Sequence, residues 1–218
     1  MIYKNRSIQI SCDGGAATGK STGGKMIAKK YKLKFLSSGL LYRYASFLIL
    51  KHKPKNKITF LKKKFKKLNY YKLIKINLHS PEISKQSAII AKINLVRKIL
   101  KSYQINFSKK NKNCCIEGRD ISTKILPSSD VKFYFKCNLN TAAIRRHKEL
   151  RKTNAKIKLK EVKKALRIRN MLDTKRKFSP LLKHRDSVEI DTGKLNKHSM
   201  LIKMSKIVES VIKNKYGN

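Results

Sequence analysis

Several short stretches of the chain alternate apolar and polar residues, as strands with one buried face do. β-branched and aromatic residues are frequent in these stretches, which also favours strands. Between them, apolar residues recur every three or four positions, the spacing typical of an amphipathic helix. We therefore predict strands near residues 7–12, 34–37, 113–117, 131–137 and 187–191.

The helical spacing follows most of the predicted strands. We expect helices over residues 22–31, 38–50, 80–107, 138–152, 156–172 and 196–215. Ser38 is expected to cap the second of these, and Ser80-Pro81-Glu82 has the residue types that open the third. Strands that alternate with helices predict an α/β fold, with a five-stranded parallel sheet and helices on both of its faces.

Residues 51–77 interrupt this alternation because they are dominated by lysine. A short amphipathic helix is predicted there from five apolar residues, namely Ile58, Phe60, Leu61, Phe65 and Leu68. Residues 73–76 have the composition of a short strand. Two interpretations of the segment remain open: a small mobile insert, or a solvated linker.

Residues 14–21, Gly-Gly-Ala-Ala-Thr-Gly-Lys-Ser, fit the spacing G-x-x-x-x-G-K-[ST], between a predicted strand and a predicted helix. Glycines let such a loop curl so that its N–H groups point inward, and the helix N-terminus adds positive charge. Lys20 can follow the β- and γ-phosphates, and the Ser21 hydroxyl can ligate Mg²⁺ directly or through water. The residues expected to hold the donor triphosphate, which the resemblance described below implies is ATP, are Gly14, Gly15, Ala16, Ala17, Thr18, Gly19, Lys20, Ser21 and Thr22.

The chain has 55 Lys and Arg residues against 12 Asp and Glu, a formal net charge of +43. A strongly basic domain is one feature of nucleic-acid binders. However, the lysines are spread along the whole length and far outnumber the arginines, whereas specific phosphate readers favour arginine. We interpret the charge as compositional bias that also attracts anionic nucleotides. No dedicated nucleic-acid partner is expected, although weak, salt-sensitive RNA binding would follow from the charge alone.

The four cysteines, Cys12, Cys114, Cys115 and Cys137, form no C-x-x-C pair, and we expect reduced, mostly buried thiols. No apolar run approaches the ~20 residues of a membrane span. The charged start followed by a strand does not fit a signal peptide. We therefore expect a monomeric protein of the cytoplasm with no membrane partner.

Several motifs, in this order, resemble those of the bacterial cytidylate kinases. They are Asp13-Gly14, Ser38-Gly39-Leu40-Leu41-Tyr42-Arg43, Ser80-Pro81-Glu82-Ile83-Ser84, Glu117-Gly118-Arg119-Asp120, Leu126-Pro127, Arg145-Arg146 and Arg169…Asp173…Arg176…Ser179-Pro180-Leu181. The resemblance covers nearly the whole chain and implies transfer of the ATP γ-phosphoryl group to CMP or dCMP, with Mg²⁺. It also implies one kinase domain over residues 1–218, with a shortened monophosphate-binding insert near 51–78 and a lid and hinge near 145–176.

The resemblance also implies roles for individual residues, with Lys20, Arg119 and Arg176 as the catalytic ones. Arg97 and Asp120 would lie beside the cytosine ring, where a carboxylate accepts from the exocyclic amine and repels the carbonyl of uracil. The residues implied to bind CMP are Ser38, Arg43, Arg97, Arg119, Asp120, Arg169, Asp173 and Arg176. The lid residues implied are Arg145, Arg146 and Arg151. Spacing alone predicts that Arg169, Asp173 and Arg176 share one helical face.

Some positions depart from the family pattern, among them Ser37, Ala88 and Asn170. Two alternatives therefore stay open. One is another phosphate-loop kinase that acts on a different nucleoside monophosphate, on shikimate or on dephospho-coenzyme A. The other is a basic RNA-binding module with a vestigial phosphate loop.

Overall fold

The structure is a computed structural model that describes residues 7–152 and 154–217. The chain divides into two compact units. Unit 1 comprises the residues up to Phe35 and those from Lys112 onward, and unit 2 comprises Leu36–Asn111. Each unit is described by itself below.

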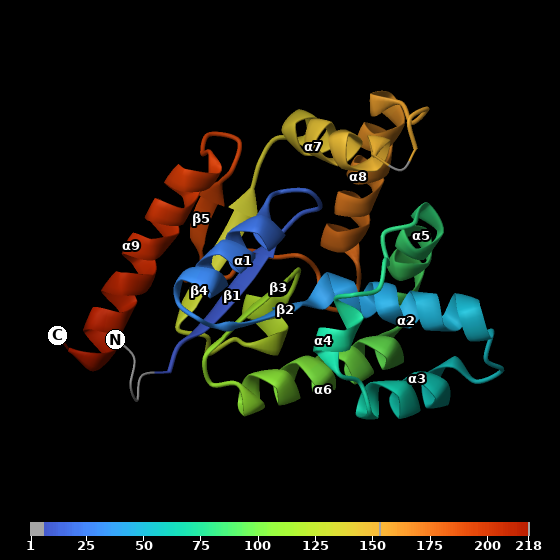
Figure 1. Ribbon diagram of the computed structural model, residues 1–218, viewed down its shortest axis with the longest axis horizontal. Helices are drawn as coiled ribbons and strands as arrows, with labels where there is room; N and C mark the ends of the chain where they lie inside the picture. The colour runs from blue at the N-terminus through green and yellow to red at the C-terminus, as the bar shows by residue number, and fades with distance from the viewer. Residues whose placement is uncertain (1–6, 153, 218) are drawn as a thin grey trace. The chain divides into compact units, whose positions relative to one another are not determined.

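A five-stranded parallel sheet is built from β1 (Gln9–Gly14), β2 (Lys34–Ser37), β3 (Cys114–Gly118), β4 (Val131–Lys136) and β5 (Val188–Asp191). The strand order is β2-β3-β1-β4-β5, so β1 is central (Figure 1). All five predicted strands are thus confirmed. In the register of β1 with β3, Asp13 lies opposite Gly118. Because the two strands are parallel, the loops that follow them leave the sheet at the same edge, where ligands of such sheets bind.

Unit 1 also contains four α-helices within the described residues: α1 (Lys20–Lys30), α7 (Leu139–Arg151), α8 (Leu159–Lys175) and α9 (Lys197–Tyr216). Helices α1 and α9 lie side by side against one face of the sheet (Figure 1). Their apolar side chains pack on β1 and β4 and form the main core, which includes Ile10, Ile27, Phe133, Met204 and Val208.

A second, smaller core lies between α7 and α8, which pack against each other (Figure 1). It is made of Ala142 and Ala143 from α7 and Val162 and Leu166 from α8. Ala16 of the phosphate loop is buried in the same cluster. The two helices are therefore attached to the loop by apolar packing.

Unit 2 consists of α2 (Ser38–His52), α3 (Lys57–Lys66), α4 (Tyr70–Leu73), α5 (Pro81–Ile90) and α6 (Asn94–Lys110). Helix α2 packs against α5 and α6, and α3 packs against α6. The amphipathic helix predicted after residue 57 is confirmed as α3, which buries Leu61 and Phe65. The strand expected at residues 73–76 is wrong, because the chain forms the helical turn α4, with Tyr70 and Leu73 buried.

The single helix predicted over residues 80–107 is also wrong, since α5 and α6 are separated by a break at residues 91–93. Ile93 adopts an extended conformation, with φ −83° and ψ 113°. The packing partners of the two helices differ. Helix α5 packs against α2, whereas α6 packs mainly against α3, so the two helices meet different surfaces. Ile93, in the break, is 39% exposed.

Helix α2 begins one residue earlier than its predicted cap implies. Ser37, not Ser38, is the N-cap, and its hydroxyl accepts from the N–H of Leu40 at 3.3 Å. Ser38 is the first helical residue and is buried. The Ser80 cap is confirmed, because its hydroxyl accepts from the N–H of Ile83 at 3.2 Å.

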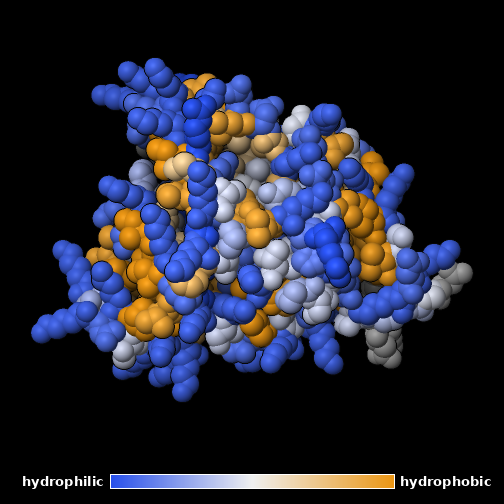
Figure 2. Space-filling view, turned by 180° about the vertical axis from the view of Figure 1, so that it is seen from behind, coloured by the Kyte–Doolittle hydropathy of each residue, from blue (hydrophilic) through white to orange (hydrophobic). Residues whose placement is uncertain are grey.

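Hydrophilic side chains cover much of the face seen in Figure 2, as the lysine content predicts. The apolar residues visible there occur in separate patches between them. Among the described residues, no helix combines the length and the hydropathy that a membrane crossing requires.

Candidate active site

The phosphate loop connects β1 to α1. Gly14 and Gly19 have positive φ angles of 153° and 85°, which favour glycine. A Cβ at Gly14 would also lie 2.4 Å from the carbonyl oxygen of Phe135, so no other residue fits there. Gly19 is the N-cap of α1 and provides no side-chain cap. The first N–H groups of α1 therefore lack a capping side chain and can bind an anion.

Lys20 is 7% exposed at the first position of α1. Its Nζ donates to the carbonyl oxygen of Gly15 at 3.3 Å and lies 3.6 Å from Oε2 of Glu117. Burial and the nearby charge of Arg119 together lower the pKa of Lys20 to about 8, although the charge of Glu117 acts to raise it. A phosphate that replaced these contacts would stabilise the charged ammonium.

Glu117 is a site residue to which the sequence analysis gave no role. It occupies the end of β3, next to the strand that carries the phosphate loop, and is buried. Its position could have identified it from the sequence, because ligands of parallel sheets bind at the carboxyl ends of the strands and Glu117 is an acidic residue near that end of a predicted strand.

A cluster of two arginines and two aspartates lies beyond the carboxyl end of β3. Arg119 Nε donates to Asp173 Oδ2 at 2.8 Å, and Arg176 Nη1 lies 3.4 Å from Asp173 Oδ1. Arg176 Nη2 lies 3.8 Å from Asp120 Oδ1. All four side chains are at most 16% exposed. The structure thus brings together four of the predicted site residues.

The charges in this cluster stabilise one another. Burial alone would raise the pKa of Asp173, but the charge and hydrogen bond of Arg119, together with the charges of Arg169 and Arg176, outweigh it, so the pKa is lowered. Burial likewise acts to lower the pKa of Arg119, and Asp173 reverses this so that the pKa is raised.

The prediction that Arg169, Asp173 and Arg176 share one helical face is only partly correct. Arg169 and Asp173 belong to α8, whereas Arg176 follows its last residue with an extended ψ of 140°.

Asp13, the residue before Gly14, fixes the segment that follows Arg119-Asp120. That segment is one π-helical turn, η1 (Ile121–Ile125). Asp13 Oδ1 accepts from the N–H of Ile121 at 2.8 Å, and Oδ2 accepts from the N–H and the hydroxyl of Ser122 at 2.7 and 2.6 Å. Burial raises the pKa of Asp13 even though these bonds oppose the rise. The carboxylate thereby joins the start of the phosphate loop to the Arg119-Asp120 segment.

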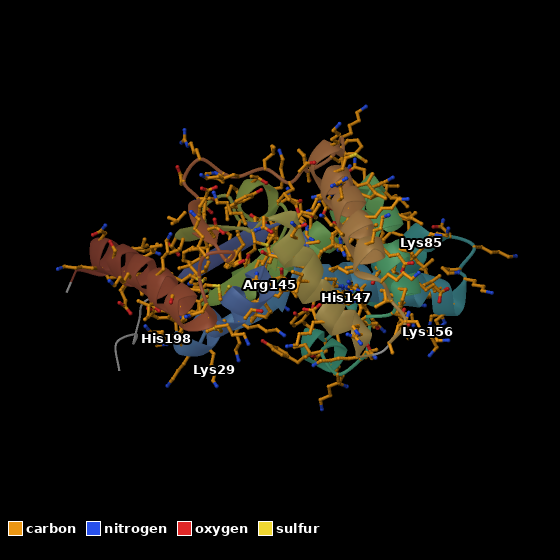
Figure 3. The ribbon with its side chains drawn as sticks, turned by 90° about the horizontal axis from the view of Figure 1, so that it is seen from above. Lys29, Lys85, Arg145, His147, Lys156 and His198 are labelled. Carbon is orange, nitrogen blue, oxygen red and sulfur yellow. The ribbon has the colours of Figure 1, made fainter. Side chains whose placement is uncertain are left out.

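Arg145, on α7 (Figure 3), is attached to the phosphate loop through Thr192. Its Nη1 donates to the Thr192 hydroxyl oxygen at 2.9 Å, and its Nη2 donates to the Thr192 carbonyl oxygen at 2.7 Å. The Thr192 hydroxyl in turn donates to the carbonyl oxygen of Thr18 at 2.8 Å. Thr192 follows the last residue of β5, and nothing in its local sequence indicated this contact.

The other two lid candidates make no such link to the loop among the contacts described. Arg146 pairs with Glu149 of the same helix at 2.8 Å. Arg151 is exposed at the last position of α7.

The remaining candidates belong to unit 2, where α2 carries Arg43. This side chain is 8% exposed, and its Nη1 donates to the carbonyl oxygen of Leu78 at 3.1 Å and to the hydroxyl of Ser84 at 2.8 Å. Both partners are neutral oxygens.

Arg97, on α6, is also buried, at 6% exposed. Its Nη1 donates to the carbonyl oxygen of Ala91 at 3.3 Å, and its guanidinium carbon lies 5.7 Å from the centre of the Tyr42 ring. Ser38 is buried at the start of α2. Arginines are seldom buried to this extent. Arg43 and Arg97 are therefore held in place within unit 2 and are not solvated surface groups.

A central parallel strand that leads into a glycine loop at a helix N-terminus defines a phosphate-loop nucleotide-binding protein. Two solved structures share the fold: an uncharacterized protein from Eubacterium ventriosum, with a TM-score of 0.54, and TT1252 from Thermus thermophilus, with a TM-score of 0.52. The first is 14% identical in sequence and the second 15%. Each match covers 94% of this chain, together with 99% of the first structure's chain and 98% of the second's.

The family model for cytidylate kinase matches residues 10–213. A cytidylate kinase of Mesomycoplasma hyopneumoniae strain 7448 is 33% identical over 93% of this chain and 94% of its own. A cytidylate kinase of Bartonella tribocorum is 34% identical over 94% of this chain and 95% of its own length. The chain therefore belongs to the cytidylate kinase family.

Proposed function

We propose that this chain transfers the γ-phosphoryl group of ATP to CMP or dCMP and forms CDP or dCDP. Family membership supports the reaction type. The structural observation that carries the proposal is in unit 1, where the Nζ of buried Lys20 lies 3.6 Å from Oε2 of Glu117, two residues before Arg119. The residues proposed for the donor phosphates and for the acceptor thus occur at one edge of the sheet.

The donor is proposed to bind along residues 14–22. In the described residues, no group of three or more His, Cys, Asp or Glu side chains forms a metal site. Mg²⁺ is usually held by one or two protein oxygens together with substrate phosphates and water, so the exposed hydroxyl of Ser21 fits this role. When bound, Mg²⁺ neutralises charge on the β- and γ-phosphate oxygens.

The acceptor is proposed to bind through the residues that the family resemblance assigns to CMP. Ser38, Arg43 and Arg119 would hold the CMP phosphate, and Arg97 with Asp120 would select cytosine. Three residues from α8 and its end would contact the sugar and phosphate, namely Arg169, Asp173 and Arg176. Residues 51–78 would serve as the shortened insert for the monophosphate.

Catalysis then depends on position and charge. Phosphoryl transfer passes through a loose transition state whose charge is spread over the equatorial oxygens. The attacking group is an already ionised phosphate, so no strong general base is needed. Lys20, Arg119 and Arg176 are proposed to stabilise this charge, as preorganised cations do. Residues 145–176, with Arg145, Arg146 and Arg151, are proposed to close as a lid and exclude water.

A screen of acceptors tests the proposal. The protein is given Mg·ATP with CMP, dCMP, UMP, AMP, shikimate or dephospho-coenzyme A, and ADP formation is followed. We expect kcat/KM to be highest for CMP and dCMP. A preference for AMP or UMP would refute the cytosine assignment, and turnover of shikimate or dephospho-coenzyme A alone would replace it with another phosphate-loop kinase.

Asp120→Ala sharpens the screen. If Asp120 reads the cytosine amine, the variant should lose about 10- to 100-fold in kcat/KM for CMP and much less for UMP, because only cytosine offers that donor. An equal loss for both bases would show that Asp120 does not select the base.

A further inference from the structure

One residue of α8 makes a polar contact with the phosphate loop. The side-chain oxygen Oδ1 of Asn170 accepts from the N–H of Ala16 at 3.1 Å. The same stretch of loop is held by apolar packing, since Ala16 is buried against Val162 and Leu166 of α8. The helix and the loop are therefore joined by a directional bond in addition to packing.

The residue before Ala16 leaves room for this contact. A Cβ built on Gly15 would lie 3.2 Å from Oδ1 and 3.5 Å from Nδ2 of Asn170. Gly15 is not among the residues with positive φ, so its backbone conformation does not require glycine. The close approach of the Asn170 amide gives Gly15 a reason to lack a side chain.

Asn170 is placed between two proposed acceptor contacts on the same helix. Arg169 precedes it, and Asp173, three residues later, binds Arg119 at 2.8 Å. A shift of α8 relative to the loop would therefore move the acceptor contacts relative to the donor phosphates. In-line transfer tolerates little movement of the acceptor relative to the donor, because a displacement of about 1 Å can cost on the order of 100-fold in rate.

We propose that Asn170 is a positioning residue, whose bond to the Ala16 N–H sets the distance between α8 and the phosphate loop. The inference rests on the proposed function, because it concerns the alignment of donor and acceptor phosphates.

Steady-state kinetics of Asn170→Ala and Asn170→Asp test this role. The alanine variant should lose about tenfold in kcat, with KM for ATP and CMP changed less than about threefold, because position rather than binding is lost. The aspartate variant keeps an acceptor oxygen at the same place and should restore kcat to within about threefold. Lys206→Ala, at an exposed position of α9 outside the proposed lid, is the control and should behave as wild type.

Amide exchange of Ala16 gives a readout that needs no acceptor. In the ¹⁵N-labelled protein we expect the Ala16 N–H to exchange more slowly in wild type and Asn170→Asp than in Asn170→Ala. An alanine variant with unchanged kcat, or one with reduced kcat and unchanged Ala16 exchange, would overturn the inference. If wild type failed to phosphorylate CMP, the proposed function would fail while the exchange result still decided whether the contact exists.

Gly15→Ala is an independent test of the same contact. It crowds Asn170 from the loop side and should also lower kcat. The double variant Gly15→Ala with Asn170→Ala should lose less than the two single variants added together, since both act on one contact. Additive losses would contradict the role.

Discussion

The phosphate loop and the helices of unit 2 contrast in how their site residues are held. In the loop region, the cations Lys20 and Arg119 are buried next to the carboxylates of Glu117 and Asp173. In unit 2, Arg43 is held by neutral oxygens of the backbone and of a serine. Removing a charged group from a buried ionic arrangement costs more than removing a neutral partner. Substitutions in the loop region should therefore have the larger effects.

The largest effect is expected for Lys20→Ala. Loss of the ammonium removes charge stabilisation from the transferring phosphoryl group, and kcat/KM should fall by about 100- to 1,000-fold or more. The fall should be the same for every acceptor, since Lys20 contacts the donor. Lys25→Ala, at an exposed position of the same helix, should have wild-type kinetics. Normal turnover by Lys20→Ala would remove the phosphate loop from the account.

Asp13→Asn should lower stability without removing any cation. An amide offers one oxygen where the carboxylate accepts three hydrogen bonds, so buried donors of η1 lose partners. We expect the free energy of unfolding in urea to fall by about 1–3 kcal/mol. Asp186→Asn, at an exposed position, is the control. A variant as stable as wild type would show that Asp13 does not hold η1.

The depressed pKa of Lys20 predicts how ATP affinity depends on pH. Below its pKa of about 8, Lys20 is charged in the free protein, and above it the amine is neutral. ATP favours the charged form, so binding above that pH takes up a proton. The Kd for ATP should therefore rise by up to about tenfold per pH unit above pH 8.

Calorimetric titrations of wild type and Lys20→Arg across this range measure the effect. The arginine stays charged, so its Kd should be nearly independent of pH even if its affinity is lower. A wild-type Kd that did not rise above pH 8 would mean that the pKa of Lys20 is not lowered.

The smallest effect is expected in unit 2, for Ser84→Ala. The hydroxyl is a neutral oxygen that accepts from Arg43, so its loss should raise KM for CMP by about two- to fivefold with kcat little changed. Ser102→Ala on α6 serves as the control. A loss as large as that of Lys20→Ala would remove the contrast between the two regions.

The two regions also differ in how far sequence could predict them. The loop residues 14–21 were predictable because their geometry depends on glycines and a helix start that are adjacent in the chain. The break at residues 91–93 was not, because it depends on which helices α5 and α6 meet. The N-cap at Ser37 differs from the predicted Ser38 by one position. Both residues are serines, which are equally suited to cap a helix, so the sequence could not distinguish them.

Contacts between distant segments account for most of the site features that were missed. Ala16 and Asn170 are 154 residues apart, and Thr18 and Thr192 are 174 apart. No local pattern encodes either pair. The family resemblance included Arg119, Asp120, Asp173 and Arg176 among eight CMP-binding residues, and the structure brings these four together, but their kinetic roles stay predictions.

The central claim is that the γ-phosphoryl group passes from ATP to a cytidine monophosphate and not to water. It is tested most directly by giving the protein γ-labelled ATP, Mg²⁺ and CMP and by following the label. We predict that the label appears in CDP, and that Lys20→Ala abolishes its transfer. Label that appeared only in inorganic phosphate, or that stayed in ATP, would contradict the account.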